Sequence, residues 1–153
     1  MEADLTNQAQ AIRIESHGGP EVLKLVSVEV PAPAPGEVTI RQKAAGLNFI
    51  DIYYRTGLYP HPLPHGLGFE AAGDVVAVGE GVSHLKVGDR VAYGQSPIGA
   101  YATLRNVPVD RVVRLPDSIG YEEAAAVMLK GLTVQYLFRQ CHRLQEGQTI
   151  LFH

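Results

Sequence analysis

The chain has 153 residues, of which 46% are hydrophobic and 19% are charged, and this suits one ordinary globular domain with a real core. A formal net charge of −3, with basic residues scattered along the chain, argues against a protein that binds nucleic acid by neutralising phosphates. The single cysteine excludes an internal disulfide and a multi-cysteine zinc cluster, and it indicates a reducing, cytoplasmic compartment.

The N-terminal region predicts a flexible tail followed by a strand hairpin. Residues 1–9 carry two acids and no apolar run, so we expect neither a signal peptide nor a transit peptide. No apolar run in the chain approaches the roughly 20 residues that span a bilayer, and we expect no membrane partner. Residues 10–16 alternate between apolar and polar side chains, and residues 22–30 form a second apolar strand after a Gly-Gly-Pro turn.

A third strand and a short helix follow a proline-rich loop. Residues 37–44 predict a strand with alternate apolar side chains turned inward. The period changes at Asn48, a residue type that caps helices, and Asp51 three positions later makes a variant of the capping box. We therefore expect a helix through about Arg55, closed by Gly57.

Glycines punctuate the stretch from residue 66 to residue 91 and indicate a strongly curved sheet. Residues 74–78 and 90–93 predict strands, and glycine-containing turns separate them. Repeated strands and glycine turns at this spacing favour a small barrel over a flat sheet. The isolated Gly-x-Gly pairs lie in strands and turns, so they do not indicate phosphate-binding loops.

Beyond residue 100 the pattern predicts two more strands and then a helix. Residues 100–107 and 111–115 are the strands. The helix begins at Tyr121, where two acids in the first turn complement the helix dipole. We expect Gly131 to break this helix.

The last 22 residues predict a second helix and one apolar strand. The helix runs from residue 132 to about residue 143, and its apolar stripe follows helical spacing: Val134, Leu137, Phe138 and Cys141. Cys141 on that stripe is typical of a buried small hydrophobic residue rather than a nucleophile. Residues 149–152 are almost purely apolar, which is typical of a strand inside a parallel sheet. We expect these elements to begin an α/β domain that the chain carries only in part.

Several runs of the sequence resemble one enzyme family. They are AGLNFIDIYYRTGLY (45–59), GLGFEAAGDVVAVGEGV (66–82), KVGDRVAYG (86–94), AAAVMLKGLTVQYL (124–137) and TILFH (149–153). In order and spacing they are similar to the zinc-independent NADPH:quinone oxidoreductases of the medium-chain dehydrogenase/reductase superfamily, alongside zeta-crystallin. The resemblance extends from about residue 10 to the last residue.

This resemblance implies a fold and a function. The fold is mainly β with short helices: a GroES-like β-barrel catalytic domain at residues 10–128, then the first helix and strand of an NADPH-binding Rossmann domain at residues 129–153. The implied activity is NADPH-dependent reduction of a quinone, or another electron-poor small molecule, by hydride transfer without a metal. The resemblance also implies a homodimer, and we expect the isolated 153-residue chain to be inactive because the rest of the Rossmann domain is absent.

The metal-free expectation rests on residues. Zinc-dependent relatives in this superfamily place a cysteine at the position of Asn48 and a histidine at that of Phe69, and neither residue present here can replace those ligands. A site built from His61, His65 and Glu70 is disfavoured, because prolines between the two histidines forbid helical spacing. We expect no metal site.

The resemblance implies two overlapping sets of site residues. Asn48, Tyr53 and Tyr59 are expected on the catalytic side, where the Asn48 amide orients a carbonyl and the tyrosines line a quinone pocket. The set expected to bind NADPH is Asn48, Asp51, Met128, Lys130 and Thr133.

Plain structural interpretations compete with these roles. Asn48 and Asp51 are also the capping pair of the predicted helix, and Tyr53 is of a type more often found in a core. Lys130 also fits an exposed lysine at the end of a helix. We expect Glu70 to brace the barrel through hydrogen bonds.

Two other functions stay open at this point. An enone or alkenal reductase of the same superfamily shares the fold and the hydride donor. If the short chain is the natural product, it is instead a non-catalytic GroES-like binding module or a structural, crystallin-type protein.

Overall fold

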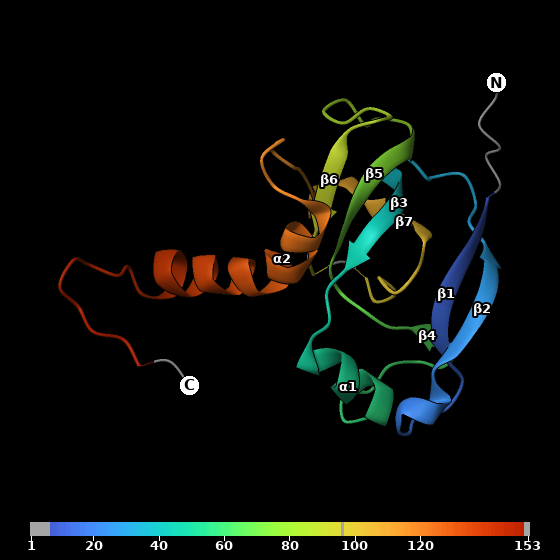
Figure 1. The fold of residues 1–153 in the computed structure, drawn as a ribbon, viewed down its shortest axis with the longest axis horizontal. Coiled ribbons are helices and arrows are strands. Elements are labelled where there is room, and N and C mark those ends of the chain that lie inside the picture. The colour runs from blue at the N-terminus through green and yellow to red at the C-terminus, as the bar shows by residue number, and fades with distance from the viewer. Residues whose placement is uncertain (1–6, 96, 152–153) are drawn as a thin grey trace.

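A computed structural model of the chain describes residues 7–95 and 97–151, and in it two antiparallel sheets face each other (Figure 1). One sheet has the strand order β2-β1-β4 and the other β7-β3-β5-β6-β8. The strands are β1 (Gln8–Ile14), β2 (Lys24–Glu29), β3 (Glu37–Ala45), β4 (His65–Gly66), β5 (Ala71–Val78), β6 (Arg90–Tyr93), β7 (Leu104–Pro108) and β8 (Val112–Arg114). The helices are α1 (Phe49–Thr56), α2 (Tyr121–Tyr136), the 3₁₀ turns η1 (Pro20–Val22) and η2 (Val109–Arg111), and the π turn η3 (Leu137–Cys141).

The segment before β7 joins the two sheets. Ala11 of β1 forms a bridge with Ala102, and the Ile12 N–H donates to the Tyr101 carbonyl at 2.8 Å. On the other side, the Gln42 N–H of β3 donates to the Thr103 carbonyl at 2.9 Å. Because one segment hydrogen-bonds to both sheets, they close into the small barrel that the glycine pattern predicted.

Register shifts give the larger sheet its curvature. The pairing of β3 with β5 shifts twice, between Thr39 and Ile40 and between Gln42 and Ala44, and each shift increases the local bend. Gly73 of β5 lies against β3 so closely that a Cβ there would collide with the Arg41 carbonyl oxygen. The enclosed core consists of fully buried apolar side chains: Val38, Ile40, Val75, Val91, Tyr93 and Val107.

The C-terminal region differs from the prediction at three places. α2 runs without a break through Gly131 to Tyr136, because one glycine costs a helix only about 1 kcal/mol. Residues 149–151 form no strand, since no described segment pairs with them, and Phe152 lies outside the described residues. Cys141 is exposed rather than buried, because the last turns of α2 and η3 project away from the barrel (Figure 1).

Two predicted boundaries fall within continuous elements of the structure. β1 begins at Gln8, inside the stretch predicted as a tail (1–9), of which residues 1–6 lie outside the described residues. α2 is continuous across the predicted division between residues 128 and 129. Within the described part of the chain, no helix is both long and apolar enough to cross a membrane.

The contact at Gly73 yields a stability prediction. We expect Gly73→Ala to lower the free energy of unfolding by about 1–3 kcal/mol, because the added methyl group must push two paired strands apart. Gly131→Ala is the control, since nothing lies within 4 Å of a Cβ at that helical position, and alanine there should stabilise the helix by up to about 1 kcal/mol. Urea unfolding monitored by circular dichroism measures both variants. A Gly73→Ala midpoint equal to that of the wild type would contradict the packing described for β3 and β5.

Candidate functional site

The site begins at the N-terminus of α1. Asn48 is the N-cap residue with an extended backbone (φ −135°, ψ 153°), and its N–H donates to Asp51 Oδ2 at 2.8 Å. Gly57 ends the helix in the left-handed conformation (φ 81°), which glycine adopts without strain. The predicted helix and its capping residues are therefore confirmed, and they fix where Asn48 points its side chain.

Glu70 receives that side chain. It lies directly before β5, and it is completely buried. Its Oε1 accepts a hydrogen bond from Asn48 Nδ2 at 2.7 Å, and its Oε2 accepts one from the Leu129 N–H of α2 at 2.6 Å. One carboxylate thus connects the start of β5 with α1 and with α2, which is the bracing expected of it.

Lys130 completes a closed triangle of polar side chains. Its Nζ donates to Glu70 Oε1 at 2.9 Å and to Asn48 Oδ1 at 2.7 Å. Because α2 continues to Tyr136, Lys130 does not lie at a helix end, and the interpretation as a helix-end lysine is wrong. The Lys130 side chain is 56% exposed, whereas that of Glu70 is 0% exposed, so the ammonium group forms the open side of the triangle.

Asp51 extends this network to the segment that joins the sheets. Its Oδ2 accepts a hydrogen bond from the Tyr101 hydroxyl at 2.7 Å, while its Oδ1 has no partner among the described residues. Burial raises the pKa of Asp51 and outweighs its hydrogen bonds, which act in the opposite direction. Burial, and then the bond to Asp51, also raise the pKa of Tyr101 above its usual value. The sequence reasoning did not select Tyr101, which lies 50 positions from Asp51 and follows no local pattern.

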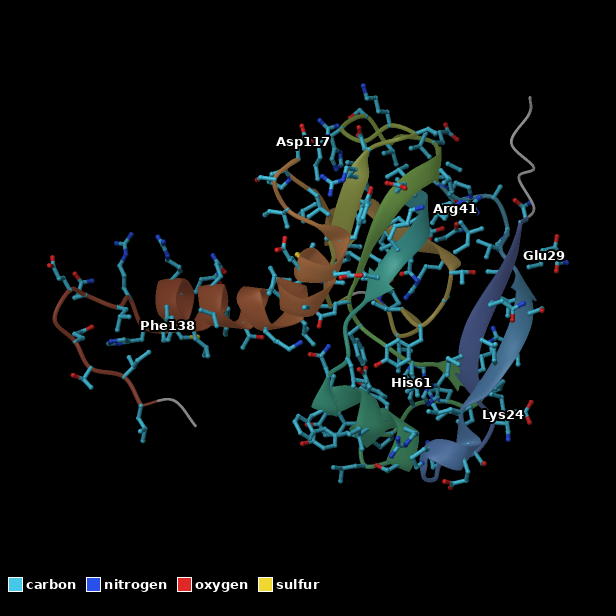
Figure 2. The ribbon with its side chains drawn as sticks, viewed as in Figure 1. Lys24, Glu29, Arg41, His61, Asp117 and Phe138 are labelled. Carbon is cyan, nitrogen blue, oxygen red and sulfur yellow. The ribbon has the colours of Figure 1, made fainter. Side chains whose placement is uncertain are left out.

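Aromatic side chains of α1 and the following loop gather beside this network. The rings of Tyr53 and Tyr59 lie 5.3 Å apart between centroids, and Tyr54 lies 5.7 Å from Tyr59 and 5.2 Å from Phe69. Tyr59 is 43% exposed, so one part of this aromatic surface is open. His61 is on the same side, between α1 and β4 (Figure 2).

Among the described residues, Met128 and Thr133 make no hydrogen bond to the side chains of the triangle. Met128 is partly buried against an alanine-rich cluster between α2 and the larger sheet. Thr133 is exposed on α2, and its hydroxyl donates to the Leu129 carbonyl at 2.9 Å. It borders a hollow of about 370 Å³ together with Gln95, Leu132, Gln135, Tyr136 and Gln140. Of the selected residues, the structure brings Asn48, Asp51 and Lys130 together and leaves these two outside.

The carboxylate that a metal site with His61 and His65 would need is committed elsewhere. The rings of His61 and His65 lie 4.7 Å apart, but the Glu70 carboxylate is held by Asn48, Leu129 and Lys130. Across residues 7–95 and 97–151, no three His, Cys, Asp or Glu side chains are arranged to hold a metal ion.

Known proteins share this arrangement of elements. The profile of the family described as "Alcohol dehydrogenase GroES-like domain" matches residues 34–117. The quinone oxidoreductase of Pseudomonas aeruginosa is 56% identical over 146 residues, which are 95% of this chain and 45% of that protein. The 2-haloacrylate reductase of a Burkholderia species is 40% identical over 147 residues, covering 92% of this chain and 44% of that one.

A solved structure shows the same similarity to the quinone oxidoreductases. The quinone oxidoreductase of Escherichia coli complexed with NADPH matches with a TM-score of 0.86 at 51% identity, over 89% of this chain and 42% of that chain. These matches confirm the resemblance to the quinone oxidoreductases and the GroES-like fold predicted from the sequence. The chain spans less than half the length of these relatives.

The buried carboxyl group of Asp51 predicts a pH dependence of stability. Its pKa is higher in the folded chain than in the unfolded chain, so its contribution is fully present below about pH 4 and is lost as the pH rises through the raised folded pKa. Asp51→Asn keeps an oxygen acceptor for Asn48 and Tyr101 and does not titrate. We therefore expect the wild type to lose stability relative to this variant as the pH rises from 4.

Urea unfolding at a series of pH values from about 4 to 8 measures this difference. Asp117→Asn is the matched control, because Asp117 is an exposed acid that lies away from α1, the helix that carries Asp51 (Figures 1 and 2). A wild type that gains stability relative to Asp51→Asn over the same range would show that the hydrogen bonds outweigh burial.

Proposed function

Because this chain belongs to the alcohol dehydrogenase GroES-like domain family, we propose that it forms the substrate-side part of an NADPH-dependent quinone reductase. The observation that carries the proposal is the 56% identity to a quinone oxidoreductase across 95% of this chain. Since that match covers 45% of the relative, we assign the activity to the barrel together with a cofactor-binding part, and not to the barrel alone.

NADPH would supply the hydride, and this chain would orient the quinone that receives it. The choice of NADPH is supported by the Escherichia coli relative, which was crystallised with it. Thr133 fits one end of such a cofactor, because its exposed hydroxyl donates to Leu129 and still has lone pairs for an amide or hydroxyl donor. The hollow beside Thr133 belongs to the same proposed contact, as does Met128, five residues earlier in the same helix.

We propose the aromatic surface beside α1 as the wall of the quinone pocket. Tyr53 and Tyr59 already pack at 5.3 Å, and the open face of Tyr59 offers a flat surface for an offset-stacked ring. Asn48 lies at the N-terminus of the same helix and brings an amide to the same side. Asp51 would act by holding the Asn48 backbone in place rather than by touching substrate.

Hydride transfer without a metal is part of the proposal. It is supported by what occupies the positions of the usual zinc ligands: the Asn48 amide is bound to Glu70 and Lys130, and the Phe69 ring packs on Tyr54. A cytoplasmic location rests on the single cysteine, and a homodimer rests on the resemblance alone.

Reduction of an activated carbon–carbon double bond is the second candidate. The observation in its favour is the 40% identity to a 2-haloacrylate reductase over 92% of this chain. Both reactions place a hydride on a substrate conjugated to an oxygen that gains negative charge, so the same pocket suits either.

A chimera tests the function and separates the two candidates. Residues 1–153 of this chain are joined to the part of the Pseudomonas aeruginosa quinone oxidoreductase that follows the segment aligned with them, and NADPH oxidation is followed by absorbance. We expect turnover with 1,4-benzoquinone, and no turnover with the 153-residue chain alone. The intact Pseudomonas enzyme is the positive control, and circular dichroism verifies that the chimera folds. A folded chimera that reduces 2-chloroacrylate or enones and leaves quinones untouched would overturn the proposed activity.

A further inference from the structure

We propose that Lys130, held in place by Asn48 and Glu70, is the donor that binds the carbonyl oxygen of the substrate and delivers the proton that completes the reduction. The chemical step rests on the proposed function. The donor site itself rests on the geometry of the triangle formed by Asn48, Glu70 and Lys130.

The orientation of the Asn48 amide follows from its two partners. An ammonium group only donates hydrogen bonds and an ionised carboxylate only accepts them, so Asn48 must turn Oδ1 to Lys130 and Nδ2 to Glu70. This arrangement uses one of the two N–H groups of Nδ2. The second N–H is trans to Oδ1 and points away from Lys130, so Asn48 positions the ammonium group and does not share its ligand.

Lys130 has one donor left for a ligand. Its ammonium group carries three N–H donors, of which Asn48 and Glu70 accept two. Within the described part of the chain, no acceptor is bonded to the third. Because the side chain is 56% exposed, this donor is open to an oxygen that arrives from outside. A charged donor that is fixed by two partners and open on one side suits an oxygen that gains negative charge.

Contacts on the buried side of the triangle hold it in place. Glu70 is fixed by the Leu129 N–H at 2.6 Å as well as by the two side chains. Gly46 lies so close that a Cβ there would collide with Glu70 Oε1 and with the Ala125 carbonyl oxygen. The groups that hold the Lys130 ammonium are therefore set in place before a ligand binds, which reduces the cost of orienting this donor.

The surroundings fit a ring attached to the bound oxygen. Leu47 and Phe49 flank Asn48 and are 75% and 76% exposed. Lys130 and Leu47 also border a hollow of about 390 Å³ between the end of β3 and α2. Alanine, glycine and leucine make up most of its lining, together with Glu122. Apolar side chains around a polar donor are typical of a small-molecule site, and they would exclude water from the oxygen once a ring covers them.

The step balances with a quinone as the acceptor. Hydride transfer places two electrons and one hydrogen on the quinone and leaves a negative charge on a carbonyl oxygen. The O–H bond of the hydroquinone then forms as one N–H bond of the Lys130 ammonium breaks. Water returns a proton to the exposed amine, so the net change is one quinone, one hydride and one proton converted to one hydroquinone.

The competing explanation is that Lys130 only neutralises the buried charge of Glu70. A double variant separates this explanation from the proposed donor role of Lys130. Lys130→Met alone leaves a buried carboxylate without its cation and should destabilise the chain. Adding Glu70→Gln removes that charge, so Glu70→Gln/Lys130→Met should regain stability in urea unfolding. If neutralisation is the whole role, this double variant also regains ligand binding; if Lys130 is the donor, it does not.

Binding is measured on the chain itself with 2,6-dichloro-4-nitrophenolate, a ring with an ionised oxygen, and with the uncharged 2,6-dichloro-4-nitroanisole as its matched probe. We expect the chain to prefer the phenolate by about tenfold, from its absorbance shift on binding. The preference should be lost in Lys130→Met and in the double variant, and largely kept in Lys130→Arg. Lys24→Met is the control, because Lys24 is exposed on β2, on the opposite side of the molecule from α2 (Figure 2). No preference in the wild type, or a preference that survives in the double variant, would overturn the donor site.

Turnover by the chimera tests the chemical step separately. We expect the double variant to lower kcat for benzoquinone by about 100-fold or more with a smaller change in KM. An unchanged kcat would refute the proton transfer. A wild-type chimera without quinone turnover, combined with the phenolate preference, would refute the proposed function and leave the donor site standing.

Discussion

A carboxylate with no access to water is the constraint on which the site depends. Burying an ionised group is costly unless hydrogen bonds and an opposite charge compensate it, and Glu70 meets both conditions through Asn48, Leu129 and Lys130. Each partner comes from a different place: the N-cap of α1, the backbone of α2 and a side chain of α2. Satisfying one buried charge therefore fixes how the two helices lie against the barrel.

The buried residues of the site support it, and the exposed residues face a ligand. Glu70 and Asp51 are buried and hold the backbone and side chain of Asn48, whereas Lys130, Tyr59 and Phe49 present open faces to a ligand. Close packing at Gly46 and Gly73 requires residues without a side chain, and this keeps the supporting layer dense. A rigid layer behind an exposed donor suits a site that must bind an oxygen whose charge changes during the reaction.

Local patterns in the sequence predicted the barrel and α1, because capping residues such as Asn48 and the alternation of strands act over a few positions. They failed at Gly131, where the modest cost of a glycine does not stop a helix, and at residues 149–151, where a strand needs a partner. For the site, residue types and a family resemblance selected Asn48, Asp51 and Lys130. The triangle itself was not predictable from the local pattern, since its members are 22 to 82 positions apart and meet only in the folded chain.

Amide hydrogen exchange in the wild type and in Glu70→Met most directly tests whether this buried carboxylate holds the helices on the barrel. Methionine is close to glutamate in size but offers no carboxylate, so the change removes the bonds and leaves the volume filled. We predict that protection falls selectively at Leu129 and along α1, while the amide of Ile40 in the core of β3 stays protected. Loss of protection spread evenly through the barrel, or no loss at Leu129, would contradict the role assigned to Glu70.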